Sequence, residues 1–302
     1  MNSITAIKNS FKIVWKNLIL AQPPILFLLV MTLLMSGFNR FGANNIVTLV
    51  FGASLIFLAV AFLAGWFYMV KKTIAYDLDT SIKEEEKAIQ SFGNIKHFFP
   101  GVGEYFLTAL GAGIILVVAS FIVALLAIKF GVKFFGPLDI EFLRKSMEIN
   151  TGAEMQLYLN SLSEEKLMPI LTWFVYFSFV QIVGQFVIMW WFPAMLYNTK
   201  NPLWALVLNF KFLFKHFFAS VGIILFLVFL NIVISLITSI FGTNVILSLI
   251  SFLLFFFYVT YSIVLIFLYY GQNGESTAKD YIDSGDDCDG EKLAGSESGE
   301  ED

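Results

Sequence analysis

The stretch KHFF occurs at residues 96–99 and again at 215–218, and it decides how the chain is organised. Each copy is followed by two residues and then by Val-Gly, so an eight-residue frame recurs 119 residues apart. A related frame, F-K-x-x-[WF]-K-[NH], occupies 11–17 and 210–216. The two patterns overlap within 210–218, so together they mark three places in the chain: 11–17, 96–99 and 210–218. Each of the three leads into a long apolar segment, and the sequence therefore predicts one structural unit repeated three times.

Each predicted unit is an amphipathic helix on the membrane surface followed by a transmembrane hairpin. In the first unit, apolar residues recur at helical spacing over 4–18, and Lys8, Lys12 and Lys16 form a stripe on another face. A helix with this pattern lies in the plane of the membrane surface. The units are expected at 1–72, 80–198 and 201–270.

The composition places the whole body of the protein in a membrane. The chain is 58% hydrophobic and only 14% charged, whereas about a quarter of the residues of a soluble domain are charged. A soluble fold could not hide so much apolar surface. A spanning helix needs about 20 apolar residues. We therefore predict an all-α integral membrane protein with six transmembrane helices, at 18–37, 46–70, 105–130, 169–192, 217–240 and 245–270.

Basic and aromatic side chains mark the ends of these spans. They are expected to anchor the chain at the boundary between lipid and water. The predicted anchors are Lys16, Lys96, His97, Lys215, His216, Trp190 and Trp191. An alternative is a metal site shared by the two histidines, for which Glu104 is the obvious further ligand; we favour the anchoring role because a metal needs more ligands.

The distribution of lysine and arginine predicts the topology. The termini and the loops between units hold thirteen basic residues, whereas the hairpin loops hold five. Basic residues accumulate on the cytoplasmic side, so we expect a multi-pass protein of the cytoplasmic membrane with both termini in the cytoplasm. The long hairpin loop at 131–168 would then lie outside. The apolar spacing of Ile140, Leu143 and Met147 predicts one or two short amphipathic helices there, and the loop is the best candidate for an external contact.

The C-terminal tail differs from the rest of the chain. Residues 272–302 contain 11 acidic residues and two lysines, a net charge of −9, whereas residues 1–271 carry +5. The tail has few apolar residues, so we expect a membrane domain at 1–271 and a disordered acidic cytoplasmic tail at 272–302. The tail is available to a cytoplasmic protein partner.

Polar residues within the predicted spans form one candidate site. No acidic or basic residue lies in the central part of any span, but amide and hydroxyl groups do, and a polar group in hydrocarbon needs a partner. We therefore expect them to face the protein interior, either as hydrogen bonds between helices, which we favour, or as a neutral polar pocket. The cluster consists of Gln181, Gln185, Asn231, Thr260 and Tyr261.

Three patterns carry a family resemblance: "FKIVWKN" entering a hairpin, "GWFYMVKKTIAYD" closing one, and "FPAMLYNTKNPLWAL" linking the last two. In these the chain resembles a group of prokaryotic six-helix membrane proteins. The group includes the membrane domain fused to some glycerophosphoryl diester phosphodiesterases, and relatives of unknown function. The resemblance covers most of 1–271 and implies the six-helix fold. It implies no catalytic residue, because the phosphodiesterase barrel has no counterpart in this sequence.

No catalytic motif is present in the sequence, such as a Walker loop, a zinc-protease helix or a nucleophile elbow. We therefore predict no enzyme, no cofactor, no metal site and no nucleic-acid partner; membrane lipids are the expected surroundings. The leading hypothesis is a scaffold, assembly or accessory factor of the membrane. The alternative is a transporter or lipid-handling protein with a neutral polar pocket between its helices.

Overall fold

The computed structural model describes residues 2–38, 45–79, 81–83, 87, 92–137, 140–149, 151–241 and 245–283, and almost all of them are helical. Six helices are long and apolar enough to cross a bilayer. They are α2 (Gln22–Phe38) together with the short helix Leu18–Ala21 before it, α3 (Asn45–Leu78), α5 (Phe98–Phe135), α8 (Glu164–Tyr197), α10 (Phe217–Phe241) and α11 (Val245–Asp283). The predicted all-α integral membrane protein with six transmembrane helices is confirmed.

Shorter helices connect and precede the spans. They are α1 (Ser3–Lys16), η1 (Leu18–Ala21), η2 (Phe92–His97), α6 (Ile140–Glu148), α7 (Gly152–Ser161) and α9 (Pro202–Lys215). The start of α9 follows from its sequence: the Asn201 side chain accepts hydrogen bonds from the amides of Leu203 and Trp204, at 3.0 and 3.3 Å, and Pro202 occupies the first turn.

The two KHFF stretches occupy the same position relative to the helix ends. His97 ends η2 and Phe98 begins α5; likewise His216 caps the C-terminus of α9 and Phe217 begins α10. The shared letters thus mark a shared break between a short helix and a span. Most of residues 80–91 lies outside the described part of the chain. The complete threefold repeat therefore remains a prediction.

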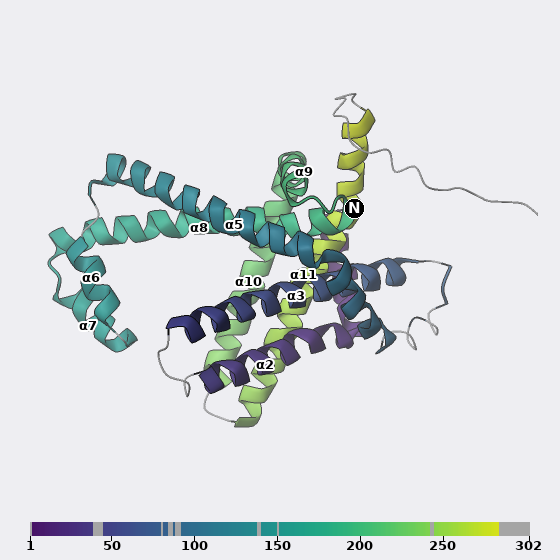
Figure 1. The fold of residues 1–302 in the computed structure, drawn as a ribbon, viewed down its shortest axis with the longest axis horizontal. Helices are drawn as coiled ribbons and strands as arrows, with labels where there is room; N and C mark the ends of the chain where they lie inside the picture. Colours follow the sequence, from purple (N-terminus) through teal and green to yellow (C-terminus); the bar gives the residue numbers. More distant parts are fainter. Residues whose placement is uncertain are drawn as a thin grey trace, which may run out of the picture.

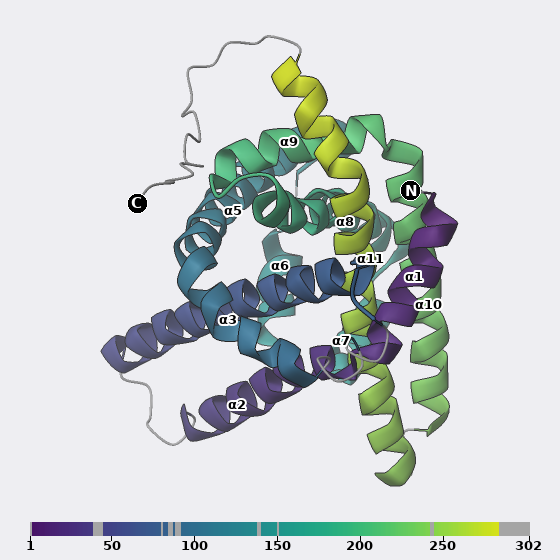
Figure 2. The same cartoon turned by 90° about the vertical axis from the view of Figure 1, so that its right-hand side faces the viewer.

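The core lies where the second helices of the three hairpins meet. We call this region the hub: residues 62–74 of α3, 190–196 of α8 and 261–270 of α11, covered by α1 and α9. Figure 1 and Figure 2 show the three hairpins diverging from it. Hydrogen bonds join its parts: Trp66 Nε1 donates to the Leu20 carbonyl at 2.9 Å, and Tyr261 donates to the Ile7 carbonyl at 3.2 Å.

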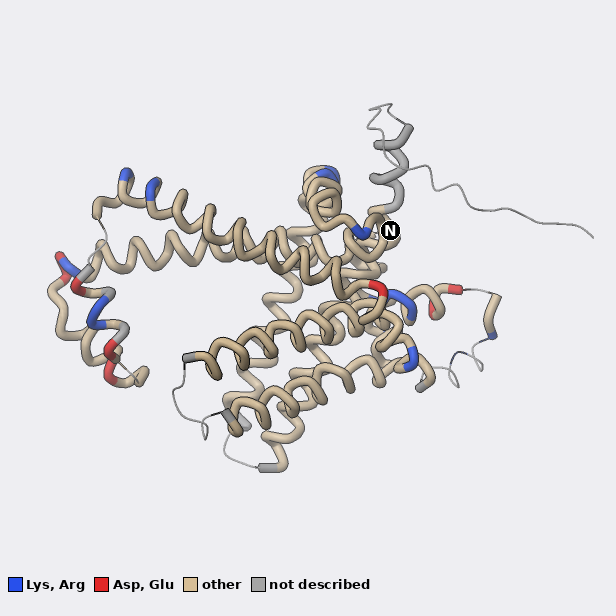
Figure 3. Tube along the Cα trace, in the orientation of Figure 1, with Lys and Arg blue, Asp and Glu red and all other residues tan. Residues whose placement is uncertain are grey.

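Charged side chains mark the two ends of the molecule. In the part of the chain that Figure 3 colours, they gather near the hub and around the α6–α7 tip, and the spans between them carry none. The 38 residues of α5 extend about 57 Å, well beyond a hydrocarbon core of about 30 Å. Helix α5 is therefore longer than a hydrocarbon core requires, and the loop end of its hairpin with α8 carries α6 and α7.

The C-terminal boundary differs from the prediction. Helix α11 continues through Gly271 to Asp283, so 272–283 are helical rather than part of a disordered tail. Gly271 does not stop the helix; a Cβ there would lie 2.8 Å from Tyr197 Cζ, so the glycine permits close packing of α11 on α8. Residues 284–302 lie outside the described part.

Candidate functional site

The predicted polar cluster is not assembled. Gln181 and Gln185 on α8 and Asn231 on α10 are exposed on the surface of the single chain, whereas Thr260 and Tyr261 on α11 are buried. The expectation that the three amides face the interior is therefore wrong. The physical reason is that the hairpins diverge from the hub (Figure 1), so the described part of the chain leaves these three positions on α8 and α10 uncovered.

The predicted anchors fall into two groups. Lys96 and Lys215 are exposed at breaks between helices, and Lys16, His97 and His216 are partly exposed. Trp190 and Trp191 are only 0% and 3% exposed, because they pack in the hub; Trp191 Nε1 donates to the carbonyl of Pro202 at 2.9 Å. Neither indole faces lipid, so their assignment as membrane anchors is corrected.

The histidine alternative gains no ligands from the structure. Within the described ranges no three His, Cys, Asp or Glu side chains gather as a metal would require. The predicted further ligand, Glu104, pairs with Lys200 Nζ at 3.1 Å. His216 packs its ring against Phe212, with centroids 5.0 Å apart. Burial, reinforced by the Lys215 ammonium, lowers the pKa of His216.

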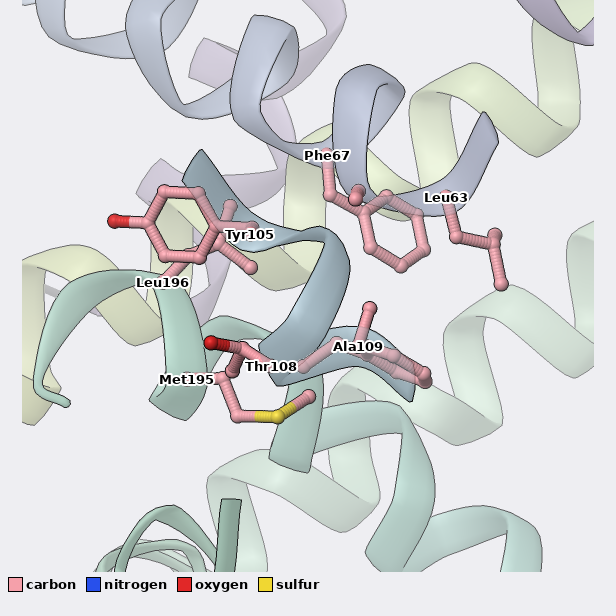
Figure 4. A pocket seen from close by; sticks show the side chains of 9 residues that line it. Leu63, Phe67, Tyr105, Thr108, Ala109, Met195 and Leu196 are labelled. Carbon is pink, nitrogen blue, oxygen red and sulfur yellow. The ribbon is translucent and has the colours of Figure 1, made fainter. Parts of the chain in front are cut away.

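A small space in the hub is a packing gap. It lies between α3, α5 and α8, where Figure 4 shows side chains such as Phe67, Tyr105 and Met195 converging. Its volume of about 10 Å³ admits one water molecule at most. Its walls are almost wholly apolar, and Thr108 is one of its few polar neighbours. The space is too small to bind a solute or a lipid.

A much larger cavity lies at the loop end of the α5–α8 hairpin. We call it the loop-end cavity; its volume is about 650 Å³. Helices α6 and α7 form one wall and the first turns of α8 the other, at the end of the molecule opposite the hub (Figure 1). The lining is Pro137, Phe142, Ser146, Met155, Leu159, Glu165, Lys166, Pro169, Ile170, Leu171, Trp173, Phe174 and Phe177.

Helical spacing explains why these residues share the cavity. Phe142 and Ser146 lie one turn apart on α6, as do Met155 and Leu159 on α7. The N-terminus of α7 is fixed by Thr151, whose hydroxyl accepts a hydrogen bond from the Glu154 amide at 3.3 Å. The two short helices confirm that the loop forms helices. The side chains of Ile140, Leu143 and Met147, on which the amphipathic pattern rests, lie outside the described residues.

Trp173 joins the cavity wall to α5. It is 4% exposed, and a Cβ on Gly131 would clash with its ring, so the glycine lets the indole seat against α5. Phe177 stacks on the same indole, with centroids 5.3 Å apart. In the described part of the chain, no group accepts a hydrogen bond from Trp173 Nε1. Because this nitrogen is fully buried, an occupant of the cavity could not reach it without a movement of the indole.

Three polar side chains accompany the apolar wall: Ser146, Glu165 and Lys166. Glu165 and Lys166 are exposed, and Glu165 begins the helix with Glu164. Pro169 has no amide hydrogen, so the Glu165 carbonyl lacks its usual helical donor. The cavity thus combines an apolar interior with one cationic and one anionic side chain.

The sequence predicted the loop at 131–168, but it did not predict that the first turns of α8 line a cavity. The stripe of Pro169, Ile170, Trp173, Phe174 and Phe177 follows helical spacing, but it lies in a segment that is apolar on every side. Such a segment gives no periodic contrast by which one face stands out. The available signal in the sequence was Pro169, a proline within the helix four residues before Trp173.

Comparison of the chain with protein-family models, with curated protein sequences and with solved structures found no match.

Proposed function

We propose that this protein is a non-catalytic lipid-handling membrane protein that holds an acyl chain in the loop-end cavity. The observation that carries the proposal is the cavity itself, whose volume of about 650 Å³ lies within the roughly 300–1,000 Å³ of typical ligand sites. Its interior is built from aliphatic and aromatic side chains. An acyl chain would replace water in contact with that surface, and the hydrophobic effect would favour its binding.

The position of the cavity supports a ligand taken from the bilayer. It lies between the charged residues of α6 and α7 and the apolar part of α8, so with lipid around α8 it would lie at the boundary of the bilayer. Leu171 and Phe174 line it and are 45% and 69% exposed, so its rim continues into the surface that faces lipid. A lipid could enter from the side without crossing the polar end.

The polar residues suit the head of an amphiphile. The Lys166 ammonium would pair with a phosphate or carboxylate. Because Glu165 stands beside Lys166, a headgroup that carries both charges would be paired more completely than a purely anionic one. We propose this function ahead of the scaffold hypothesis because the loop-end cavity is a feature that fits a ligand.

The orientation belongs to the same proposal. The excess of lysine at the hub end supports a cytoplasmic hub and an external cavity, in the cytoplasmic membrane of a prokaryote. Six-helix relatives of the phosphodiesterase membrane domains would share this topology, if the resemblance reflects common descent.

Filling the cavity tests the function directly. Met155→Trp places a bulky ring inside it, whereas Leu157→Trp adds the same ring to the same helix at a position 71% exposed and outside the lining. Native mass spectrometry of the proteins purified from membranes would count bound lipid. We expect several-fold less lipid on Met155→Trp and no change on Leu157→Trp. Equal lipid on the unmodified protein and both variants would overturn the proposal.

A further inference from the structure

Two amide side chains are exposed on the surface of α8, and the described residues give them no hydrogen-bond partner. Gln181 and Gln185 lie one turn apart near the middle of the 34-residue helix, and both are exposed. None of the hydrogen bonds within the described ranges involves either amide. Their neighbours on the same helix are apolar and also exposed, such as Phe174 at 69% and Ile182 at 63%.

An isolated amide in hydrocarbon is unfavourable because no water replaces its lost hydrogen bonds. Helices in membranes relieve this cost by pairing such side chains across an interface. Two amides at i and i+4 point to the same side of a helix, so one partner helix can satisfy both. The face around Gln181 and Gln185 therefore has the chemistry of a helix-pairing surface.

A second copy of the same face supplies the complementary groups. Each amide carries two donors and one acceptor, so identical amides can bond to each other across a twofold axis. Gly184 lies between them in the sequence, and a Cβ there would meet no atom within 4 Å. Packing within the chain therefore does not require a glycine at this position. The absence of a side chain at Gly184 leaves room for another helix to approach α8.

We propose that two copies of this chain pair through α8, with Gln181 and Gln185 of one copy hydrogen-bonded to the same residues of the other. The copies share one orientation in the membrane, so the twofold axis runs along the membrane normal and the α8 helices are parallel. The two amides lie outside the lining of the loop-end cavity, although Phe174, two turns before Gln181 on the same face of α8, borders both.

Disulfide cross-linking tests the geometry of the pair. In a chain whose Cys288 is replaced by serine, Gln185→Cys should form a covalent dimer in native membranes under mild oxidation. Phe179→Cys is the matched control: it is 63% exposed, but two residues from Gln181 it projects from nearly the opposite side of the helix. Equal cross-linking of the two variants would overturn the proposal. So would labelling of the Gln185→Cys variant by a water-soluble maleimide without cross-linking, because the face would then line an aqueous path.

Removing the amides tests their contribution. The double variant Gln181→Leu, Gln185→Leu remains apolar and should insert normally, but its dimer should weaken by about tenfold for each amide removed. Asn231→Leu removes an exposed amide from α10 and should leave the dimer intact. Mass measurement in mild detergent reports the oligomer, and bound lipid on the same samples reports the cavity. If the double variant forms as much dimer as the unmodified protein, the pairing through α8 is refuted. The proposal that the cavity binds lipid would not be affected by that result.

Discussion

At the scale of single residues, close approaches between helices depend on glycines whose role is invisible in the sequence. Gly131 on α5 faces the Trp173 ring, whereas Gly113 on the same helix has no atom within 4 Å of an added Cβ. Both sit in apolar helical sequence and look alike there. Only the packing of α8 against α5 separates them, because it decides which glycine has a neighbour.

Replacing these two glycines by alanine should have opposite effects. Gly131→Ala forces the Trp173 ring out of its seat, so we expect a loss of about 1–3 kcal/mol of stability and a smaller cavity. Gly113→Ala meets no neighbour and improves helix propensity, so it should be neutral or slightly stabilising. Thermal unfolding in detergent compares them. Equal unfolding temperatures for both variants would contradict the assigned contact.

His216 gives the protein a pH dependence with a definite sign. Burial lowers the pKa of His216 below its ordinary value of 6.5, so the unfolded chain binds a proton more readily than the folded one. Its contribution to stability is therefore complete above pH 6.5 and is lost as the pH falls through the folded pKa. The unfolding temperature should decline from about pH 7.5 to about pH 5, and His216→Gln should decline less. A steeper decline in His216→Gln would contradict the sign.

At the scale of elements, the sequence predicts the existence of each helix well and its ends poorly. The six spans are evident from apolar length alone. Their ends are not: α3 runs on to Leu78 and α11 to Asp283, because no proline follows and polar residues continue a helix readily outside lipid. The letters KHFF recur at the starts of α5 and α10, but the predicted span at 105–130 begins seven residues after α5 does.

The start of α9 offers a test at this scale. Asn201→Ala removes the acceptor for two backbone amides, and we expect a loss of about 1 kcal/mol, measured as a lower unfolding temperature. Asn160→Ala on α7 removes an exposed asparagine within a helix and should change little. An unchanged unfolding temperature in Asn201→Ala would mean that the packing of α9 on α8, not its cap, holds the helix.

At the scale of the whole molecule, the sequence could not tell which side of a span faces protein. The hub aromatics Trp190, Trp191 and Tyr269 resemble residues of a lipid boundary, yet they form the core. Conversely Gln181 and Gln185 resemble interior residues, yet they are exposed. Spans that are apolar all round carry no periodic signal for orientation. The loop-end cavity arises from the same arrangement, because it needs α6, α7 and α8 placed together.

The orientation of the molecule can be measured by labelling cysteines in intact cells. Ala153→Cys, in a chain lacking Cys288, puts an exposed thiol on α7 at the loop end. We expect a membrane-impermeant maleimide to label it from outside, since the lysine excess places the hub in the cytoplasm. The unmodified chain, with Cys288, should react only after lysis. The reverse pattern would place the loop-end cavity inside the cell.

The central claim is that an acyl chain occupies the loop-end cavity, and photolabelling tests it most directly. A fatty acid with a diazirine on its chain would be incorporated into membranes and irradiated, and the attachment sites would be mapped by peptide mass spectrometry. We expect labels concentrated on cavity residues such as Met155, Leu159 and Phe177, and competition by unlabelled fatty acid. Labels spread evenly over lipid-exposed positions of α2, α8 and α10, unchanged by competitor, would contradict the claim.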